Sequence, residues 1–186
     1  LTLTANYIVP GIKAPAQLLE GWQVNSSVTL NSATAYNAFD TNSDISGTGE
    51  KDDRWNLSGD PHDFWGFGAD KNIPCWGITA SSFAGASGCT AVAIPAGATT
   101  PAAQVANMPA ACISAASQDA GNPLVANSSG LASLVKFGCY TSGNSAIVAP
   151  AQGTFGNMGR NVLRGQGMRI SDMTLRSRIR PSWDAR

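Results

Sequence analysis

The stretch from Leu18 to Ala38 constrains the fold of this 186-residue chain more than any other. From Trp22 onward, apolar or small residues alternate with polar ones, and the first series occupies the even positions Trp22, Val24, Ser26, Val28, Leu30, Ser32, Thr34, Tyr36 and Ala38. A period of two predicts a β-strand, because a helical period of 3.6 would scatter these side chains around its circumference. Two interpretations stay open: a transmembrane barrel strand with one face toward lipid and one toward a wet lumen, or a long edge or sandwich strand of a soluble protein.

Composition narrows the classes of protein to which the chain can belong. The formal net charge is zero, with 12 basic and 12 acidic residues, so nothing in the charge balance favours a nucleic-acid partner. Charged residues make up 13% of the chain, a low share that is typical of secreted and surface β-proteins. No run approaches the roughly 18 apolar residues of a membrane helix. The first residue is Leu and no signal peptide is recognisable, so we expect a processed chain, an internal fragment or a reading frame cut from a longer one.

Further strands are predicted at the two ends of the chain. In residues 1–9 apolar or small side chains alternate with polar ones, which predicts a strand, and the Pro10-Gly11 pair then indicates a short connection. A last strand is predicted from Met173 to Arg180, with Arg176, Arg178 and Arg180 on one face, which suits a lumen or water but not lipid. The predicted fold is mainly β: antiparallel strands of a partial outer-membrane-type barrel or an open sheet, with a long disulfide-linked loop that carries short helical turns. We expect a single unit with a strand hairpin at 1–39, a surface loop insertion at 40–138, and a Gly-rich segment and last strand at 139–186.

Three of the four cysteines lie in the insertion and the fourth, Cys139, directly follows it. Two short helices are predicted within the insertion. Thr100 and Pro101 have the residue types of an N-cap and a first helical turn, and residues 129–137 read as helical turns that end at Gly138. Without a Cys-x-x-Cys pair and with one histidine in the chain, a zinc site is poorly supported, and two disulfides in an oxidising compartment are the better interpretation. Three connectivities are open. The pairing that closes local loops joins Cys75 to Cys89 and Cys112 to Cys139.

An Asx-rich stretch opens the insertion. Oxygen-bearing side chains at Asp40, Asn42, Asp44 and Glu50 resemble the start of a calcium loop, in which alternate residues point inward. Ile45 stands where such a loop needs glycine, and Lys51 stands where it needs glutamate. A solvated turn is therefore favoured over calcium, and no other cofactor is expected.

Aromatic residues follow the Asx-rich stretch, at Trp55, Phe64, Trp65 and Phe67. Flat apolar rings suit the faces of pyranose sugars, so these four are candidate ligand-binding residues. The structural interpretation, which we favour, is a small core that lets a long loop keep its shape.

Catalytic motifs are scarce. The sequence has no Gly-x-Ser-x-Gly elbow, P-loop or His-Glu-x-x-His pattern. His62 lies between Asp60 and Asp63, so a carboxylate-oriented base with a serine nucleophile is conceivable. A solitary histidine in a polar loop is more often simply solvated. The sequence therefore favours a non-enzymatic role, and any activity would be that of a hydrolase.

Three stretches carry a resemblance to a known family: VPGIKAPAQLLEGWQVNSSVTL at 9–30, DISGTGEKDDRWNLSGDPHDF at 44–64, and GCYTSGNSAIVAPAQGTFGNMGRNVLRGQG at 138–167. They resemble, in the same order, the C-terminal part of the barrel in large TonB-dependent outer-membrane receptors of the acidobacterial, Oar-like type, which have a carboxypeptidase-regulatory-like domain. The resemblance implies barrel strands joined by an extracellular loop, within a protein that imports a bulky nutrient with energy relayed by TonB. It identifies no ligand residue. The plug domain, the TonB box and the terminal aromatic residue of the family are absent from the sequence, and about eight strands are needed to close a barrel, so we expect a segment of a larger receptor.

The leading functional prediction is thus a fragment of a TonB-dependent receptor at the bacterial outer membrane or cell surface, which takes up or binds a bulky nutrient such as a glycan. Its expected partners are the TonB system, through the missing parts of the parent protein, and the membrane itself. The alternative is a soluble secreted β-domain that acts as a small hydrolase or a glycan-binding module. A third prediction is self-association through unpaired strand edges, which offer free backbone N–H and C=O groups.

Overall fold

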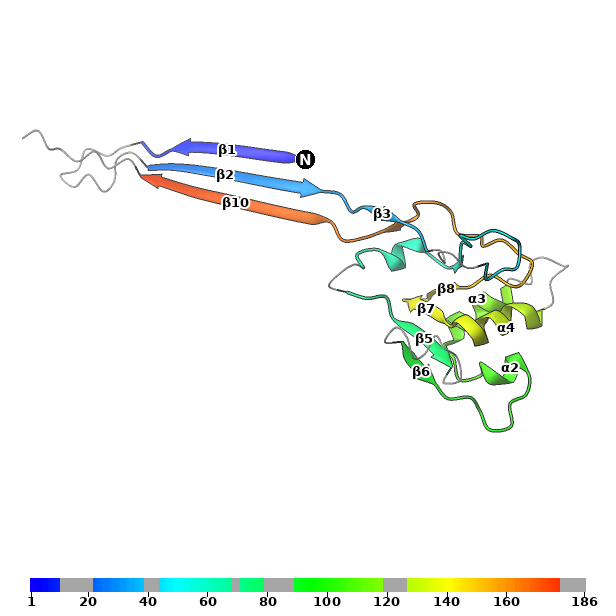
Figure 1. The fold of residues 1–186 in the computed structure, drawn as a ribbon. Helices are drawn as coiled ribbons and strands as arrows, with labels where there is room; N and C mark the ends of the chain where they lie inside the picture. Colours follow the sequence, from blue (N-terminus) through cyan, green and yellow to red (C-terminus); the bar gives the residue numbers. More distant parts are fainter. Residues whose placement is uncertain (11–21, 39–43, 68–70, 79–88, 119–126, 178–186) are drawn as a thin grey trace, which may run out of the picture. The chain divides into compact units, whose positions relative to one another are not determined.

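The computed structural model describes residues 1–10, 22–38, 44–67, 71–78, 89–118 and 127–177. The chain divides into two compact units (Figure 1). Unit 1 comprises Leu1–Ala33 and Gly167–Arg186, and unit 2 comprises Thr34–Gln166. The chain therefore leaves the first unit once, forms the second from a continuous segment, and returns.

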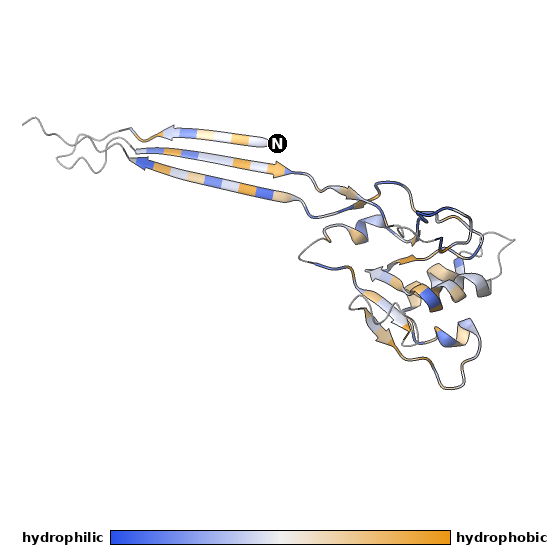
Figure 2. Ribbon diagram, viewed as in Figure 1, coloured by the Kyte–Doolittle hydropathy of each residue, from blue (hydrophilic) through white to orange (hydrophobic). Residues whose placement is uncertain are grey.

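Unit 1 contains a three-stranded antiparallel sheet in the order β1-β2-β10. Its strands are β1 (Thr2–Ile8), β2 (Trp22–Asn31) and β10 (Met168–Ser177). The register places Val24 of β2 between Tyr7 of β1 and Leu175 of β10. Residues paired in this way share a face, so the alternation of β2 extends across all three strands, and Figure 2 shows it as alternating bands along the strands.

Two predicted strand boundaries were wrong. The long alternating stretch breaks after Asn31, and its continuation, β3 (Ala35–Tyr36), pairs with β9 (Leu163–Arg164) in a separate sheet of unit 2. The last strand begins at Met168 rather than Met173. Its first residues break the predicted alternation, because Arg169 lies opposite Leu30 on the apolar face and Ile170 lies opposite Thr29 on the polar face. Residues 18–21 and 178–180, which were also predicted as strand, lie outside the described part of the chain.

Unit 2 is built on a five-stranded sheet in the order β4-β8-β7-β5-β6. Its strands are β4 (Asn56–Ser58), β5 (Cys75–Ile78), β6 (Thr90–Val92), β7 (Cys139–Ser142) and β8 (Ser145–Val148), and every neighbouring pair is antiparallel except β5 with β6. The unit also contains the helices α2 (Pro101–Gln104), α3 (Ala110–Gln118) and α4 (Asn127–Phe137) and the 3₁₀ turn η2 (Pro61–Phe64).

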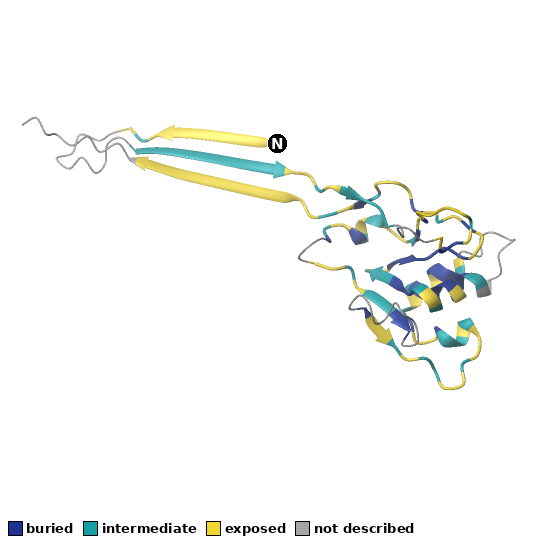
Figure 3. Cartoon of the chain, in the orientation of Figure 1, coloured by how far each residue is buried: buried dark blue, intermediate teal, exposed yellow. Residues whose placement is uncertain are grey.

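Strand β8 divides two hydrophobic cores. Ala146 and Val148 pack on one side, in a core that includes Val105, Cys112 and Leu134 from the helical segment. Ile147 packs on the other side, in a core whose buried members include Ile45, Trp55, Phe64, Met158 and Leu163. All four residues of β8 are buried (Figure 3). Burial on both faces is the property of a central strand.

The two helices predicted from sequence are confirmed at their caps. The Thr100 side chain accepts a hydrogen bond from the Ala103 amide, and Pro101 occupies the first turn of α2. Helix α4 ends at Phe137, and the next residue, Gly138, has a φ of 65°, the left-handed conformation that commonly ends helices. Helix α3 was missed, because its Ala- and Ser-rich sequence has little helical amphipathicity.

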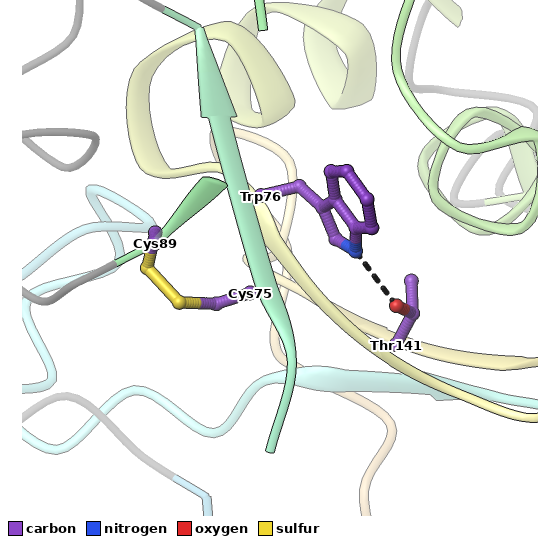
Figure 4. Close-up of a disulfide and its surroundings, with 4 residues drawn as sticks. All are labelled: Cys75, Trp76, Cys89 and Thr141. Carbon is purple, nitrogen blue, oxygen red and sulfur yellow. Dashed lines mark hydrogen bonds between the residues drawn. A yellow bond between two sulfur atoms is a disulfide. The ribbon is translucent and has the colours of Figure 1, made fainter. Parts of the chain in front are cut away.

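Both disulfides are present with the pairing that closes local loops. Cys75 and Cys89 are joined with a Cα–Cα distance of 4.7 Å, and Cys112 and Cys139 with 6.0 Å. Figure 4 shows the first bridge beside β5, where the neighbouring Trp76 donates an indole hydrogen bond of 2.8 Å to Thr141. The mainly β fold with antiparallel strands, open sheets and a disulfide-linked insertion is confirmed. No helix in the described residues is long and apolar enough to cross a membrane.

We predict that the two bridges contribute unequally to the stability of unit 2. They close loops with sequence separations of 14 and 27 residues. Loop entropy alone gives about 3 and 3.5 kcal/mol, a small difference. However, Cys112 and Cys139 are fully buried in the helical core, whereas Cys75 is only half-buried. Replacing both of the former with alanine therefore also leaves a cavity, which adds on the order of 1 kcal/mol.

The measurement is thermal unfolding of the Cys112→Ala/Cys139→Ala and Cys75→Ala/Cys89→Ala proteins, followed by near-ultraviolet circular dichroism. We expect the first pair to lower Tm by several degrees more than the second. Equal shifts would contradict the contribution assigned to the helical core.

Candidate functional site

The 3₁₀ turn η2 and its two flanking residues place three side chains that could take part in catalysis or binding at the surface of unit 2. Asp60 is its N-cap and accepts hydrogen bonds through Oδ1 from the backbone amide of His62 at 2.9 Å and from His62 Nδ1 at 2.6 Å. The imidazole lies against Trp65, with ring centroids 4.1 Å apart and planes tilted by 46°. The hydrogen bonds from the His62 amide and imidazole hold the pKa of the Asp60 carboxyl below its ordinary value.

Contacts with two other segments, at Tyr36 and at residues 162–164, hold this turn in place. The Tyr36 hydroxyl donates to the Phe64 carbonyl at 2.9 Å, and the Trp65 indole donates to the Val162 carbonyl at 3.1 Å. The Gly66 amide donates to the Arg164 carbonyl at 2.9 Å. Burial raises the pKa of Tyr36, so its hydroxyl remains a donor at neutral pH.

The predicted catalytic group does not assemble around His62. The nearest serine contact in the cluster belongs to Asp63, whose Oδ2 accepts a 2.6 Å hydrogen bond from Ser145 Oγ. Ser145 Oγ in turn accepts a hydrogen bond from the Asp60 amide at 2.8 Å, and Ser145 is only 1% exposed. A nucleophilic serine must give its proton to a base and reach a substrate. Ser145 gives its proton to a carboxylate and is buried, so it is not placed to act as the nucleophile of a triad with His62.

The predicted aromatic ligand-binding residues separate into core and surface. Phe64 is fully buried, and Trp55 and Phe67 are less than 10% exposed, so their rings belong to the interior. Trp65 is 43% exposed. Sugar stacking by all four residues is therefore excluded by burial, and Trp65 alone presents a substantial surface.

The predicted calcium ligands have other partners where they are described. Asp44 accepts hydrogen bonds from the amides of Thr48 and Gly49, both at 2.9 Å, which closes a turn. Glu50 is exposed, and Asp40 and Asn42 lie outside the described residues. Among the described residues, no group of three or more His, Cys, Asp or Glu side chains is placed to hold a metal ion.

A second candidate site was not found by sequence reasoning: an open hollow on the polar face of the unit 1 sheet. Six of its lining residues belong to the polar face, namely Thr4, Asn6, Asn25, Ser27, Asp172 and Thr174, and the lining also includes Ala5 and Ser26, whose side chains belong to the opposite face. Next to it, Gln23 Nε2 donates to Asn6 Oδ1 at 3.0 Å and to Asn25 Oδ1 at 3.3 Å. Alternation shows which residues of one strand share a face, but only the register between strands shows that these side chains meet.

Comparison with known proteins gives one match. A family model described as "Outer membrane beta barrel domain" matches residues 1–182. No curated protein and no solved structure matches the chain.

We predict that Gly59 is required to bring η2 against Ser145. Gly59 has a φ of 103°, and a Cβ at this position would lie 2.3 Å from Ser145 Oγ and 2.9 Å from Ser145 Cα. Gly66, at the other end of the turn, has a φ of 78° and no atom within 4 Å of the corresponding Cβ. The matched variant Gly66→Ala should cost about 1–2 kcal/mol through backbone strain alone. Gly59→Ala should cost about 1–3 kcal/mol more because of the clash.

Urea unfolding of the two variants, followed by tryptophan fluorescence, measures this difference. Equal losses of unfolding free energy in the two alanine variants would show that the approach of Gly59 to Ser145 is unimportant.

Proposed function

Because the chain belongs to the outer membrane β-barrel domain family, we propose that β1, β2 and β10 are wall strands of a TonB-dependent receptor barrel and that unit 2 is its surface-exposed insertion. In this proposal the whole protein takes up or binds a bulky nutrient such as a glycan. The observation that carries the proposal is the register of the three strands, which sorts their side chains into one apolar and one polar face.

The apolar face suits contact with lipid. Across the three strands it presents Leu3, Ala5, Tyr7, Trp22, Val24, Ser26, Val28, Leu30, Ser171, Met173 and Leu175, with Arg169 at one end. Leu3, Met173 and Leu175 are more than half exposed in the structure. A soluble protein rarely leaves so continuous an apolar surface in water, whereas a barrel wall turns it toward the acyl chains.

Strand length and the ends of the apolar face also fit a membrane wall. Strands β2 and β10 each have 10 residues, within the roughly 9–11 residues of a tilted transmembrane strand. Trp22 and Tyr7 lie toward one end of the face, and Arg169, the cation among its side chains, lies opposite Leu30 toward the other. Aromatic and charged side chains are best tolerated at the two interfaces.

The polar face suits a wet lumen. It contains the hollow described above, and Arg176 lies opposite Gln23 on the same face. A charged side chain is costly against lipid and acceptable against water, so the positions of Asp172 and Arg176 agree with this orientation.

The chain path and the disulfides support an external position for unit 2. The chain leaves the sheet at Asn31 and returns at Met168, and these two residues are register partners. Long connections of outer-membrane barrels lie on the outer side, and disulfides persist in oxidising surroundings. TonB, acting through parts of the parent protein beyond this chain, and the outer membrane are the proposed partners. The sequence resemblance at 9–30, 44–64 and 138–167 supports the receptor type.

We predict opposite outcomes for arginine at adjacent positions of β2. Val28→Arg puts the charge on the proposed lipid face and should cost about 2–4 kcal/mol near the middle of the bilayer. Ser27→Arg, the matched control, puts the same side chain on the lumen face and should fold nearly as well as the unmodified protein. Heat-modifiable gel mobility of the full-length parent protein, after folding into lipid vesicles, gives the folded fraction of each variant.

Equal folding of both variants would contradict the assignment of the faces. A parent protein that fractionates as a soluble, secreted protein would contradict the receptor and favour the β-domain alternative.

A further inference from the structure

The surface of unit 2 at Asp60, His62 and Trp65 has features that the receptor barrel does not require. The side chains of His62 and Asp60 are 62% and 61% exposed, and Trp65 is 43% exposed. The three residues lie on one short turn, and the two rings contact each other. An apolar ring and two polar groups are thus presented side by side to solvent.

The hydrogen bonds within the turn leave one polar side-chain atom of Asp60 and one of His62 available to a ligand. Asp60 uses Oδ1 for both of its bonds with His62, and His62 uses Nδ1. Within the described residues, Asp60 Oδ2 and His62 Nε2 have no hydrogen-bond partner. The Trp65 indole N–H is occupied by the Val162 carbonyl, so the tryptophan offers its ring rather than its donor.

The backbone beneath these side chains is held from several directions. Ser145 Oγ binds the Asp60 amide and the Asp63 carboxylate, and Ser142 Oγ donates to the Asp63 carbonyl at 2.5 Å. The Gly66 amide is bound by the Arg164 carbonyl. A surface arranged before binding loses less conformational entropy on binding, which favours affinity.

We propose that Asp60, His62 and Trp65 form a binding site for a neutral saccharide. A pyranose ring has an apolar C–H face, which can pack on the Trp65 indole, and peripheral hydroxyls, which can donate to Asp60 Oδ2 and exchange a hydrogen bond with His62 Nε2. The inference rests on the proposed receptor function, since it names the ligand class and the residues that the external insertion would use.

The negative charge of Asp60 favours binding of neutral saccharides over acidic ones. The carboxylate of Asp60 repels a uronate or sulfate brought next to it, and its nearest described charge partner is His62, which is charged only when protonated. A neutral oligosaccharide avoids this repulsion. Among the described residues, no group of three or more His, Cys, Asp or Glu side chains lies at the site to hold a calcium ion for a metal-mediated sugar contact.

Titration calorimetry on the full chain tests the proposal with five neutral hexasaccharides: the β-1,4-linked forms of glucose, mannose, xylose and N-acetylglucosamine, and α-1,4-linked glucose. Hexagalacturonate is the acidic comparison. We expect at least one neutral hexasaccharide to bind and hexagalacturonate to bind at least tenfold more weakly. In ¹H–¹⁵N spectra, the indole signal that Trp65→Ala removes should shift on binding.

Three variants assign the binding to these residues. Trp65→Ala should weaken it at least tenfold, whereas Phe155→Ala, which removes another exposed aromatic side chain (65% exposed), should change it less than twofold. Asp60→Asn keeps a residue that caps the turn but removes the charge, and should weaken binding at least threefold while relieving the discrimination against hexagalacturonate.

Absence of binding by all five neutral hexasaccharides would overturn the proposal, as would binding that Trp65→Ala leaves unchanged or tighter binding of the acidic one. None of these results would affect the wall strands, whose test depends on Val28 and Ser27. Conversely, a failure of that test would leave a saccharide site on a soluble protein.

Discussion

The pairing of β2 with both of its neighbours is the interaction on which the rest of unit 1 depends. Its backbone hydrogen bonds fix Val24 between Tyr7 and Leu175, and Ser27 between Thr4 and Asp172. A shift of one residue would move a complete set of side chains to the opposite face. In the barrel wall that we propose, such a shift would turn polar side chains toward lipid, so the amphipathic pattern and the backbone register reinforce each other.

Unit 2 lies in the connection between β2 and β10, and its stability depends on hydrophobic cores of its own. Strand β8 is central to this, since Ala146 and Val148 complete one core and Ile147 completes the other. No residue of β1, β2 or β10 belongs to either core cluster of the described residues. Unit 2 therefore has hydrophobic cores of its own, and the Cys112–Cys139 bridge reduces the conformational freedom of its unfolded chain.

Sequence reasoning predicted the features that depend on nearby residues. The alternation around Val24 and Val28 identified β2, and the Thr100-Pro101 and Gly138 signals placed two helix ends. It failed where distant segments decide the outcome. The break after Asn31 follows from pairing between β3 and β9, more than 120 residues apart, and the role of Ser145 follows from contacts with Asp60 and Asp63. Burial, which separates Trp65 from Trp55, Phe64 and Phe67, is likewise a property of the complete core and not of the local pattern.

The turn at Asp60 shows how a structural hydrogen-bond network can define a surface for binding. Ser145 Oγ accepts a hydrogen bond from the Asp60 amide and donates one to Asp63 Oδ2, so it joins both ends of the turn to β8. His62 is held by Asp60 Oδ1 alone, in contact with Trp65. The side chains of Asp60, His62 and Trp65 stay exposed on the same turn. A turn held by hydrogen bonds before binding loses less conformational entropy when a ligand binds, which agrees with the saccharide site that we propose.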